Sequence, residues 1–306
     1  MKDLIIGFSS NYTYEHLKLW INSIKYSGFT GDIVLCATNI TNEDLEKIAE
    51  KGVSLCLYGK KTETGYTNPS GFAPHVERFF YIWNYLKMTE ERYRYVITTD
   101  TRDVVFQTNP SATLHQYLGD GGSSGFYNFV ALDEGLEYQD ESWGKTNYEQ
   151  CFGPFFFQEV AGNIIKNVGV IAGHHDMVRD MMLMIFQMSL NRPIPIVDQA
   201  VYNFLLDTVW IKTDGYYAPN GGSWGVNLGT TIHAVKAGAG DLGQSCLRDE
   251  ALMKNYEENY IYEQPAIQDG KVLSINGDGE VCVVHQYDRV PGLKEKIMER
   301  FDDRNS

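Results

Sequence analysis

The first hundred residues alternate between two hydrophobic periodicities, and this alternation constrains the fold more than any other feature of the chain. Four short β-rich runs at 4–10, 32–38, 53–58 and 93–99 read LIIGFSS, DIVLCAT, VSLCLY and YRYVITT. The segments between these runs have the spacing of amphipathic helices. Because strands that are joined by helices pair in parallel with right-handed crossovers, the pattern predicts an α/β fold with four neighbouring parallel strands.

The helical segments have identifiable apolar faces and ends. In the first of them, Leu17, Trp20 and Ile24 lie on one face, and Gly28 ends the helix. The third helix, at about 74–87, leads into the strand that ends at residue 99.

The pattern changes after residue 110. A Gly/Ser-rich turn follows at 119–125, then a strand-like run at 126–132 and an aromatic, irregular stretch at about 133–160. We expect a mobile or acceptor-facing loop in that irregular stretch. The rest of the chain predicts a strand at 166–173, an apolar Met-rich core helix at 174–190, a helix at 197–207 and short strands that end at 281–289.

The charge and the cysteines exclude several classes of protein. With 26 Lys and Arg against 40 Asp and Glu, the chain has a formal charge of -14, which opposes binding to nucleic acid or anionic lipid. The five cysteines have no CxxC spacing and fit neither a disulfide framework nor a zinc site. Because no run of about 18 apolar residues occurs, we expect a soluble, cytoplasmic protein without direct membrane insertion. Because the chain is acidic, a phosphate-bearing ligand needs a cation close to its binding site.

The first strand ends in a loop, GFSSNYTY, that has the composition of a nucleoside site. Its flexible backbone, hydroxyl groups and aromatic ring would hold a base and a ribose, because ligands of open α/β sheets bind beyond the carboxyl ends of strands. The alternative is a helix N-cap and a turn. The candidate residues are Gly7, Ser9, Ser10, Asn11 and Tyr12.

A polar island interrupts the β-rich stretch YVITTDTRDVVFQTNP at 95–110. Asp100 and Asp103 follow the fourth strand across a tight turn, and two carboxylates suit Mg²⁺ or Mn²⁺. Such an ion would neutralise a diphosphate on this acidic protein. The alternative is a solvated turn in which Arg102 pairs with a neighbouring acid. His285, after the late apolar run VCVV, is either a third ligand or an ordinary strand-end histidine.

In their order along the chain, these motifs resemble the metal-dependent, nucleotide-sugar glycosyltransferases with the GT-A fold. The matching features are the GFSSNYTY loop, the DxD-type acids, a NVGVIAG strand, a DQAVYN segment and the late histidine. The resemblance implies a GT-A fold with a Rossmann-like, mostly parallel central sheet, flanking helices and a smaller antiparallel sheet. It covers about 3–290 and implies one domain over 1–306, with a nucleotide-binding half at 1–110, a sugar- and acceptor-binding half at 111–290 and a C-terminal helix at 291–306.

The resemblance also implies roles for individual residues. Asp100 and Asp103 would serve the ribose, the diphosphate and the metal, and His285 would be the late metal ligand. The common motif has one residue between its two acids, whereas two residues separate Asp100 from Asp103 here. Arg102 therefore occupies the position of the second acid in the common motif, and Asp103 is the more secure metal ligand. The remaining implied contacts are Arg78 toward the nucleotide-sugar, Asn167 and Gly169 to Gly173 along the sugar pocket, and Asp198 with Gln199 as the catalytic pair; helix N-capping is the alternative for Asp198.

By this resemblance, the protein would move a hexosyl or pentosyl group from a nucleotide-diphosphate sugar, first of all a UDP-sugar, to a glycan or other hydroxyl acceptor. The DQ…N segment is similar to that of retaining glycogenin-like and galactosyltransferase-like enzymes, which favours retention. One alternative is a non-catalytic nucleotide- or carbohydrate-binding protein on the same fold. Another is a sugar-phosphate nucleotidyltransferase, but that class needs a Gly-rich, basic first loop, and GFSSNYTY has no GxG, Arg or Lys.

Overall fold

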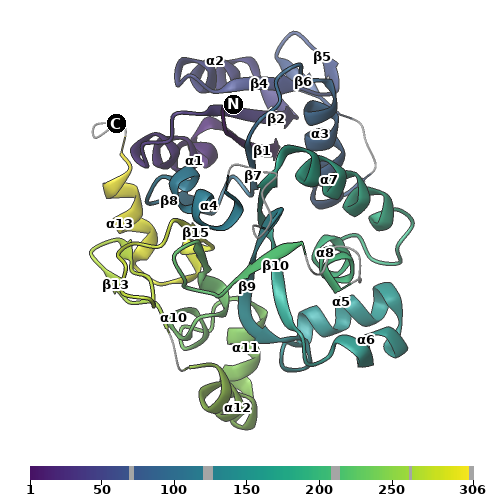
Figure 1. The fold of residues 1–306 in the computed structure, drawn as a ribbon, viewed down its shortest axis with the longest axis vertical. Helices are drawn as coiled ribbons and strands as arrows, with labels where there is room; N and C mark the ends of the chain where they lie inside the picture. Colours follow the sequence, from purple (N-terminus) through teal and green to yellow (C-terminus); the bar gives the residue numbers. More distant parts are fainter. Residues whose placement is uncertain (69–71, 120–126, 208–213, 262–263, 303–306) are drawn as a thin grey trace.

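A seven-stranded sheet forms the centre of the computed structural model, which describes residues 1–68, 72–119, 127–207, 214–261 and 264–302 (Figure 1). The order across the sheet is β11-β9-β10-β7-β1-β2-β4. Its strands are β1 (Leu4–Ser10), β2 (Asp32–Thr38), β4 (Ser54–Leu57), β7 (Tyr95–Thr99), β9 (Phe129–Glu137), β10 (Ile164–His174) and β11 (Gly215–Ala218).

The four strands predicted from the first hundred residues lie side by side and pair in parallel, which confirms that part of the prediction. Strand β10 runs antiparallel to both of its neighbours, β7 and β9, while β11 is parallel to β9. The sheet is therefore mostly parallel. Because Gly7 of β1 pairs with Thr99 of β7, the carboxyl ends of these two strands meet at one edge.

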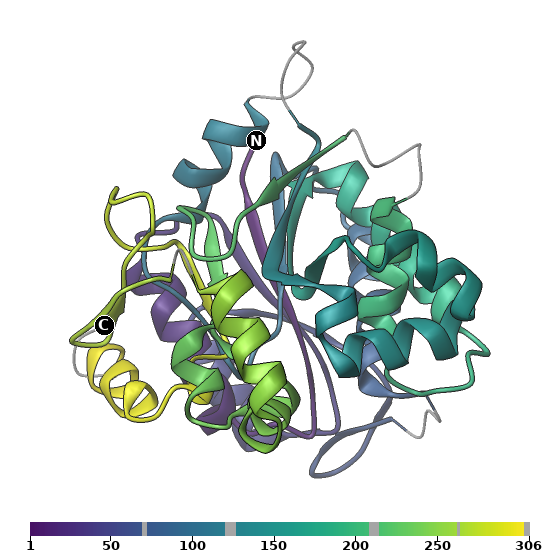
Figure 2. The ribbon, with the colours of Figure 1, turned by 90° about the horizontal axis from the view of Figure 1, so that it is seen from below.

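Helices cover both faces of the sheet, and Figure 2 shows the sheet between the two layers. On one face, Ile5 packs with α1 (Tyr14–Tyr26), α2 (Asn42–Glu50) and α4 (Pro110–Leu118). On the other, Ile6 packs with α3 (Pro74–Met88), α7 (His175–Ser189) and α8 (Asp198–Asp207). The Met-rich helix α7 is core as expected, because Met181 and Met182 are buried in that second layer.

The stretch at 133–160 is not the irregular loop that we expected. Its first five residues continue β9, and the 3-10 helix η1 (Tyr138–Asp140), α5 (Ser142–Phe152) and α6 (Pro154–Val160) follow. Helix α5 has no strong apolar stripe in the sequence and forms because Glu141 caps its first amides and because Tyr148 packs in the core. Helix α6 starts at Pro154 and buries Phe157.

A second sheet carries the late histidine. It has the order β12-β15-β8, and β15 (Val283–His285) is parallel to β12 (Gly225–Asn227) and antiparallel to β8 (Val104–Phe106). Small antiparallel sheets, as expected, are formed by β3 (Ile40–Thr41), β6 (Gly65–Thr67) and β5 (Lys60–Lys61), and by β13 (Ile267–Gln268) with β14 (Lys271–Val272). The remaining elements are η2 (Leu228–Thr230), α10 (Ile232–Val235), α11 (Gly240–Arg248), α12 (Glu250–Tyr260), η3 (Tyr287–Arg289) and α13 (Leu293–Arg300).

The remaining sequence expectations concern two peripheral segments, the cysteines, the surface charge and membrane spans. Two predicted segments lie partly outside the described residues. One is at 120–126, which contains most of the predicted Gly/Ser-rich turn and the start of the strand-like run, and the other is at 303–306, the end of the predicted C-terminal helix.

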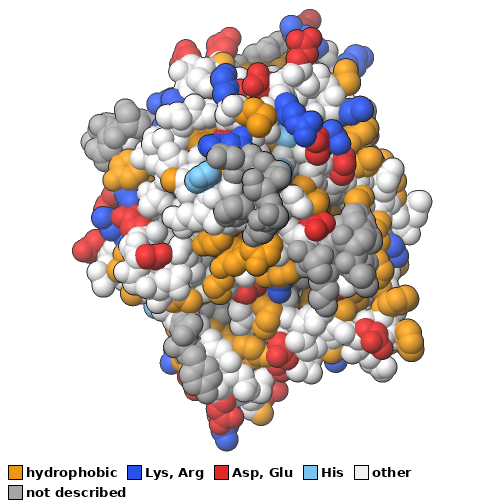
Figure 3. Space-filling model, in the orientation of Figure 1, with side chains coloured by type: hydrophobic (Ala, Val, Ile, Leu, Met, Phe, Trp, Pro, Cys, Tyr) orange, Lys and Arg blue, Asp and Glu red, His pale blue; other side chains and the backbone are white. Residues whose placement is uncertain are grey.

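All five cysteine thiols are free. On the face shown in Figure 3, acidic and basic side chains are interspersed and the basic ones do not merge into one surface. Among the described helices, none combines the length and the apolar character that a membrane span requires.

Candidate functional site

The turn that follows β7 is held in place by three neighbouring elements. The amide of Asp100 donates a 2.8 Å hydrogen bond to the carbonyl of Gly169 in β10. The hydroxyl of Thr101 donates a 3.0 Å bond to the carbonyl of Phe8 in β1, and the amide of Gln286 donates a 2.8 Å bond to the carbonyl of Asp103. This backbone network fixes the directions of both aspartates before any ligand binds.

Asp100, Asp103 and His285 form a cluster that we call the Asp/His cluster. The His285 Nε2 atom lies 3.5 Å from Asp100 Oδ2 and 3.8 Å from Asp103 Oδ1. One potential ligand atom from each residue falls within 4.8 Å of the others. The second ring nitrogen of His285 is buried without a hydrogen-bond partner among the described residues. Two carboxylates and an imidazole around one point fit a divalent cation such as Mn²⁺, because carboxylate oxygen and imidazole nitrogen are ordinary ligands for it.

The electrostatics of the Asp/His cluster favour an ionised Asp100. Burial raises the pKa of Asp100, but the Arg78 guanidinium and His285 lower it by more, so the net pKa lies well below the ordinary value. Burial raises the pKa of Asp103, and the neighbouring Asp100 carboxylate raises it further. Burial lowers the pKa of His285, but the two carboxylates raise it by more. A bound cation would relieve the repulsion between the two acids.

Arg78 joins the Asp/His cluster to helix α8. Its guanidinium donates to Asp100 through one terminal nitrogen, and through the other it donates a 2.8 Å bond to Asp198 Oδ2. The Arg78 and Asp198 side chains are only 12% and 5% exposed, so this pair is a fixed part of the wall. Asp198 is the first residue of α8, and its carboxylate is held by Arg78 rather than used only at the helix terminus.

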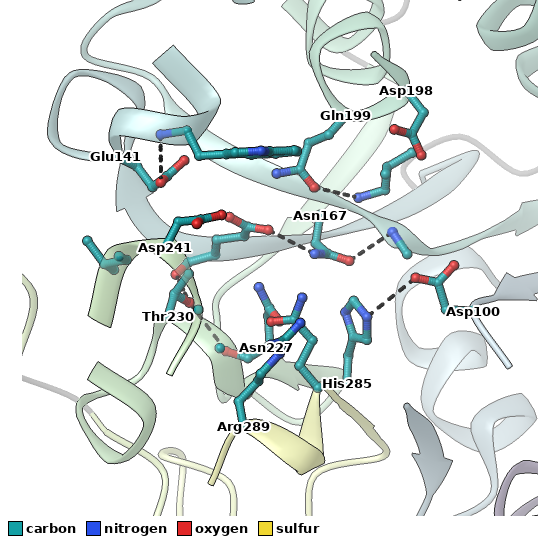
Figure 4. A pocket seen from close by; sticks show the side chains of 18 of the residues that line it. Asp100, Glu141, Asn167, Asp198, Gln199, Asn227, Thr230, Asp241, His285 and Arg289 are labelled. Atoms are coloured by element: carbon teal, nitrogen blue, oxygen red, sulfur yellow. Dashed lines mark hydrogen bonds and ion pairs between the residues drawn. The ribbon is translucent and has the colours of Figure 1, made fainter. Parts of the chain in front are cut away.

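Two cavities meet at the Asp/His cluster. Cavity A, of about 400 Å³, extends from the cluster to the end of β1, where Phe8, Ser10 and Tyr12 line it. Cavity B, of about 350 Å³, extends from the cluster along β10 and α8 (Figure 4). The residues that line both cavities are His75, Arg78, Asp100, His285, Gln286 and Arg289.

The comparisons with known proteins can be set against this geometry. No family model matches the chain, and no curated protein matches its sequence. Among solved structures, a galactosyltransferase LgtC in complex with donor and acceptor sugar analogues is similar, with a TM-score of 0.52 and 13% identity over 97% of this chain and 95% of that one. A WbbM bifunctional glycosyltransferase gives a TM-score of 0.52 and 12% identity over 98% of this chain, which spans about half, 51%, of the WbbM chain.

This chain has the GT-A fold. At such low identity the likeness establishes the fold, and it confirms the fold expected from the order of the sequence motifs. A third similar structure is an LgtC active-site variant, with a TM-score of 0.52 and 14% identity over 96% of this chain and 93% of that one.

The GT-A fold brings most of the sequence-predicted residues to one of the two cavities. Ser10, Tyr12 and Arg102 line cavity A, where Arg102 faces Asp103 and Asp288 at 3.6 and 3.8 Å. Asn167, Gly169, Asp198 and Gln199 line cavity B. Residues 170–172, between Gly169 and Gly173, are buried in β10 and line neither cavity. Four further candidates also line neither cavity: Gly7, Ser9, Asn11 and Gly173.

Packing explains where these four residues lie. A side chain at Gly7 would collide with Thr101, and one at Gly173 would approach Phe129 of the neighbouring strand, so both positions belong to the interior of the sheet. Ser9 is fully buried in β1. Asn11 is exposed and takes a left-handed backbone, with φ of 61°, where the chain turns toward α1. Gly7, Ser9 and Gly173 are thus part of the interior of the sheet, and Asn11 lies in the turn toward α1.

The centre of β10 is organised by side-chain amides. The Asn167 side chain donates a 2.8 Å bond to Glu134 Oε1 and accepts a 2.8 Å bond from the amide of Gly169. A methyl group on Gly169 would lie 2.6 Å from His285 Cε1 and 2.8 Å from Asp100 Oδ2. Glycine is therefore required at this position by the close approach of the Asp/His cluster.

Sequence reasoning missed Glu134, which lies in β9. Its carboxyl is buried and lines cavity B. Burial raises its pKa to about 7, although the hydrogen bond from Asn167 acts in the opposite direction. The apolar run FVAL before it predicts a strand that could have been extended to this residue, but the prediction of a loop from residue 133 hid it.

Other missed residues come from helix ends and from the end of strand β12 around cavity B. They share no sequence motif, and only the tertiary fold brings them to one wall. They are Glu141, Trp143, Asn227, Asp241 and Arg289.

Proposed function

We propose that this protein is a divalent-metal-dependent glycosyltransferase that moves a sugar from a nucleotide-diphosphate sugar to a hydroxyl acceptor. The observation that carries the proposal is the junction of two cavities at the Asp/His cluster. A donor of this class has three parts, a nucleoside, a charged diphosphate and a sugar. Cavity A, the Asp/His cluster and cavity B follow each other in an order that matches these three parts.

The nucleoside would occupy cavity A. Tyr12 offers an aromatic ring and Ser10 a hydroxyl at the carboxyl end of β1, where open α/β sheets bind nucleotides. Uracil is our first choice of base, which rests on the family resemblance. The diphosphate would then lie at the Asp/His cluster. Asp100, Asp103 and His285 would hold a divalent cation there, Mn²⁺ first and Mg²⁺ second, which would supply Lewis-acid stabilisation of the departing diphosphate.

The sugar would enter cavity B between Arg78, Asn167 and Gln199. The acceptor oxygen forms a bond to the anomeric carbon as the bond from that carbon to the diphosphate oxygen breaks, and the electron pair leaves with the nucleoside diphosphate. In a retaining reaction, which we favour, the hydroxyl proton passes to that diphosphate on the same face. Asp198, which is held by Arg78, would position the sugar rather than move a proton.

Gln199 is the second residue that we assign to the reaction. It lines cavity B at the start of α8, and its side-chain oxygen accepts a long 3.4 Å bond from the amide of Val168. One of the similar structures is an active-site variant of LgtC in which glutamate replaces a glutamine. We therefore place the Gln199 amide beside the donor sugar.

A panel of nucleotide sugars, each incubated with the protein and Mn²⁺, tests the proposal. Release of nucleoside diphosphate from at least one donor, lost in excess EDTA, is the expected result. Binding without any release over hours would favour the non-catalytic alternative. Pyrophosphate-dependent formation of a nucleoside triphosphate would favour the nucleotidyltransferase.

A further inference from the structure

The far wall of cavity B is built by elements that take no part in cavity A. Glu141 and Trp143 come from the start of α5, and Asp241 and Leu242 from the first turn of α11. Figure 4 shows Glu141 and Asp241 on the side of the cavity opposite Asp100. A donor sugar whose diphosphate lies at the Asp/His cluster enters from the Asp100 side, so the far wall is left for the second substrate.

Trp143 is the most exposed of the four tryptophans that the structure describes. Trp20 and Trp224 are fully buried, whereas Trp143 is 36% exposed and lines the cavity. Its backbone is fixed at the start of α5, because its amide donates a 3.0 Å hydrogen bond to Glu141 Oε1. An indole face that lines a cavity offers a surface for the apolar face of a sugar ring, and it also attracts a cation.

The charge of the far wall is negative. Glu141 is buried and Asp241 is exposed, and among the described residues neither carboxylate pairs with a Lys, Arg or His side chain. Two arginines line cavity B: Arg78 is already paired with two carboxylates, and Arg289 Nε lies 3.8 Å from Asp288 Oδ1. Burial raises the pKa of Glu141 and the like charge of Asp241 raises it further, while two helix amides lower it. An anionic second substrate would therefore be repelled.

Asn227 adds a polar group that has no partner. Its side-chain oxygen is buried at the cavity and accepts no hydrogen bond from the described residues. A buried acceptor of this kind is stabilised when a ligand hydroxyl or amine donates to it. It lies beside His285 in the neighbouring strand, so it faces the region between the Asp/His cluster and the far wall.

We propose that the Trp143, Glu141 and Asp241 wall is the acceptor subsite, and that it takes a sugar without negative charge and prefers one that carries an amine. The sugar ring stacks on Trp143, and its amine or hydroxyl groups donate to the two carboxylates. This inference rests on the proposed glycosyl transfer, because that reaction fixes which wall faces the donor.

The test uses the full chain with Mn²⁺ and the nucleotide sugar that it hydrolyses fastest. Three methyl glycosides serve as acceptors: a neutral glucoside, an amine-bearing glucosaminide and an anionic glucuronide. The variants are Trp143→Ala, the conservative Trp143→Phe, Asp241→Asn and the charge reversal Asp241→Lys. Each variant is also assayed for donor hydrolysis without acceptor, which measures the donor side alone.

We expect Trp143→Ala to raise the acceptor KM by about tenfold, Trp143→Phe to recover most of it, and donor hydrolysis to stay within about twofold. Asp241→Asn reduces the preference for the amine by about threefold to fivefold, as expected for an exposed charge pair, and Asp241→Lys admits the glucuronide. Unchanged acceptor KM values, a wild-type preference for the glucuronide, or use of none of the three glycosides by a protein that hydrolyses its donor would overturn the subsite. If the wild type hydrolyses no donor at all, the proposed function fails first and the subsite fails with it.

Discussion

Replacing Glu134 with glutamine isolates one buried carboxyl in the wall of cavity B. In the folded protein its pKa is raised from 4.5 to about 7, chiefly by burial. The unfolded chain therefore releases this proton near pH 4.5, while the folded chain keeps it until about pH 7. Because the unfolded state loses its proton first, the free energy of unfolding falls as the pH rises through this interval, and the change is complete above it.

The interval between these two pKa values corresponds to about 3 kcal/mol. Glutamine has no such proton and can still accept the 2.8 Å hydrogen bond from Asn167. We therefore expect Glu134→Gln to gain up to about 3 kcal/mol over the wild type between about pH 5 and about pH 8. Urea denaturation of both proteins across this range measures the difference, in which the titration of all other groups cancels.

A matched control replaces an exposed carboxyl, Glu46→Gln, which makes the same chemical change on the surface of α2. A difference between Glu134→Gln and the wild type that does not change with pH would refute the assignment of a buried, protonated Glu134. A difference that shrinks as the pH rises would reverse the sign of the argument.

Three further perturbations follow from the packing around the site. Gly169→Ala places a methyl group 2.6 Å from the imidazole of the Asp/His cluster, so donor hydrolysis should fall by about a hundredfold, measured as kcat, with a small change in Tm; wild-type kcat would contradict the close approach. Arg78→Gln leaves two carboxylates without their cation and should lower the free energy of unfolding by about 3–5 kcal/mol in urea, and Arg78→Lys should lose less. Met182→Ala should cost about 2–5 kcal/mol in the core, whereas the exposed Met298→Ala should stay within about 0.5 kcal/mol, and equal effects would argue against the buried face of α7.

The parts of the fold that sequence reasoning predicted are those with strong local periodicity. The run LIIGFSS and its three partners alternate with helical segments, and such a pattern has few ways to pair. The antiparallel insertion of β10 beside β7 was not predicted, because an apolar run does not record the direction of its neighbours. The helix α5 was missed because its stability comes from the Glu141 cap and from tertiary burial of Tyr148.

The candidate site, like the fold, contains residues that the sequence predicted and residues that it did not. Asp100, Asp103 and His285 stood out because each follows a strand, and the fold brings all three together. Gly7 and Gly173 were expected to be ligand contacts because of their neighbours in the sequence, but the neighbouring atoms leave no space for a Cβ at either position, and both lie inside the sheet. Residues such as Trp143 and Asp241 reach the cavity from separate helices, and no local spacing in the sequence links them.

The central claim is that catalysis depends on a cation held by the Asp/His cluster. The most direct measurement is the rate of nucleoside diphosphate release from the best donor at increasing Mn²⁺, for the wild type and for Asp103→Asn, which keeps the size of this buried side chain and removes its charge. We expect activity that saturates with Mn²⁺ and vanishes in EDTA for the wild type, and a loss of about a hundredfold or more for the variant with an unchanged Tm. Full wild-type activity in EDTA, or an Asp103→Asn variant that responds to Mn²⁺ as the wild type does, would contradict the account.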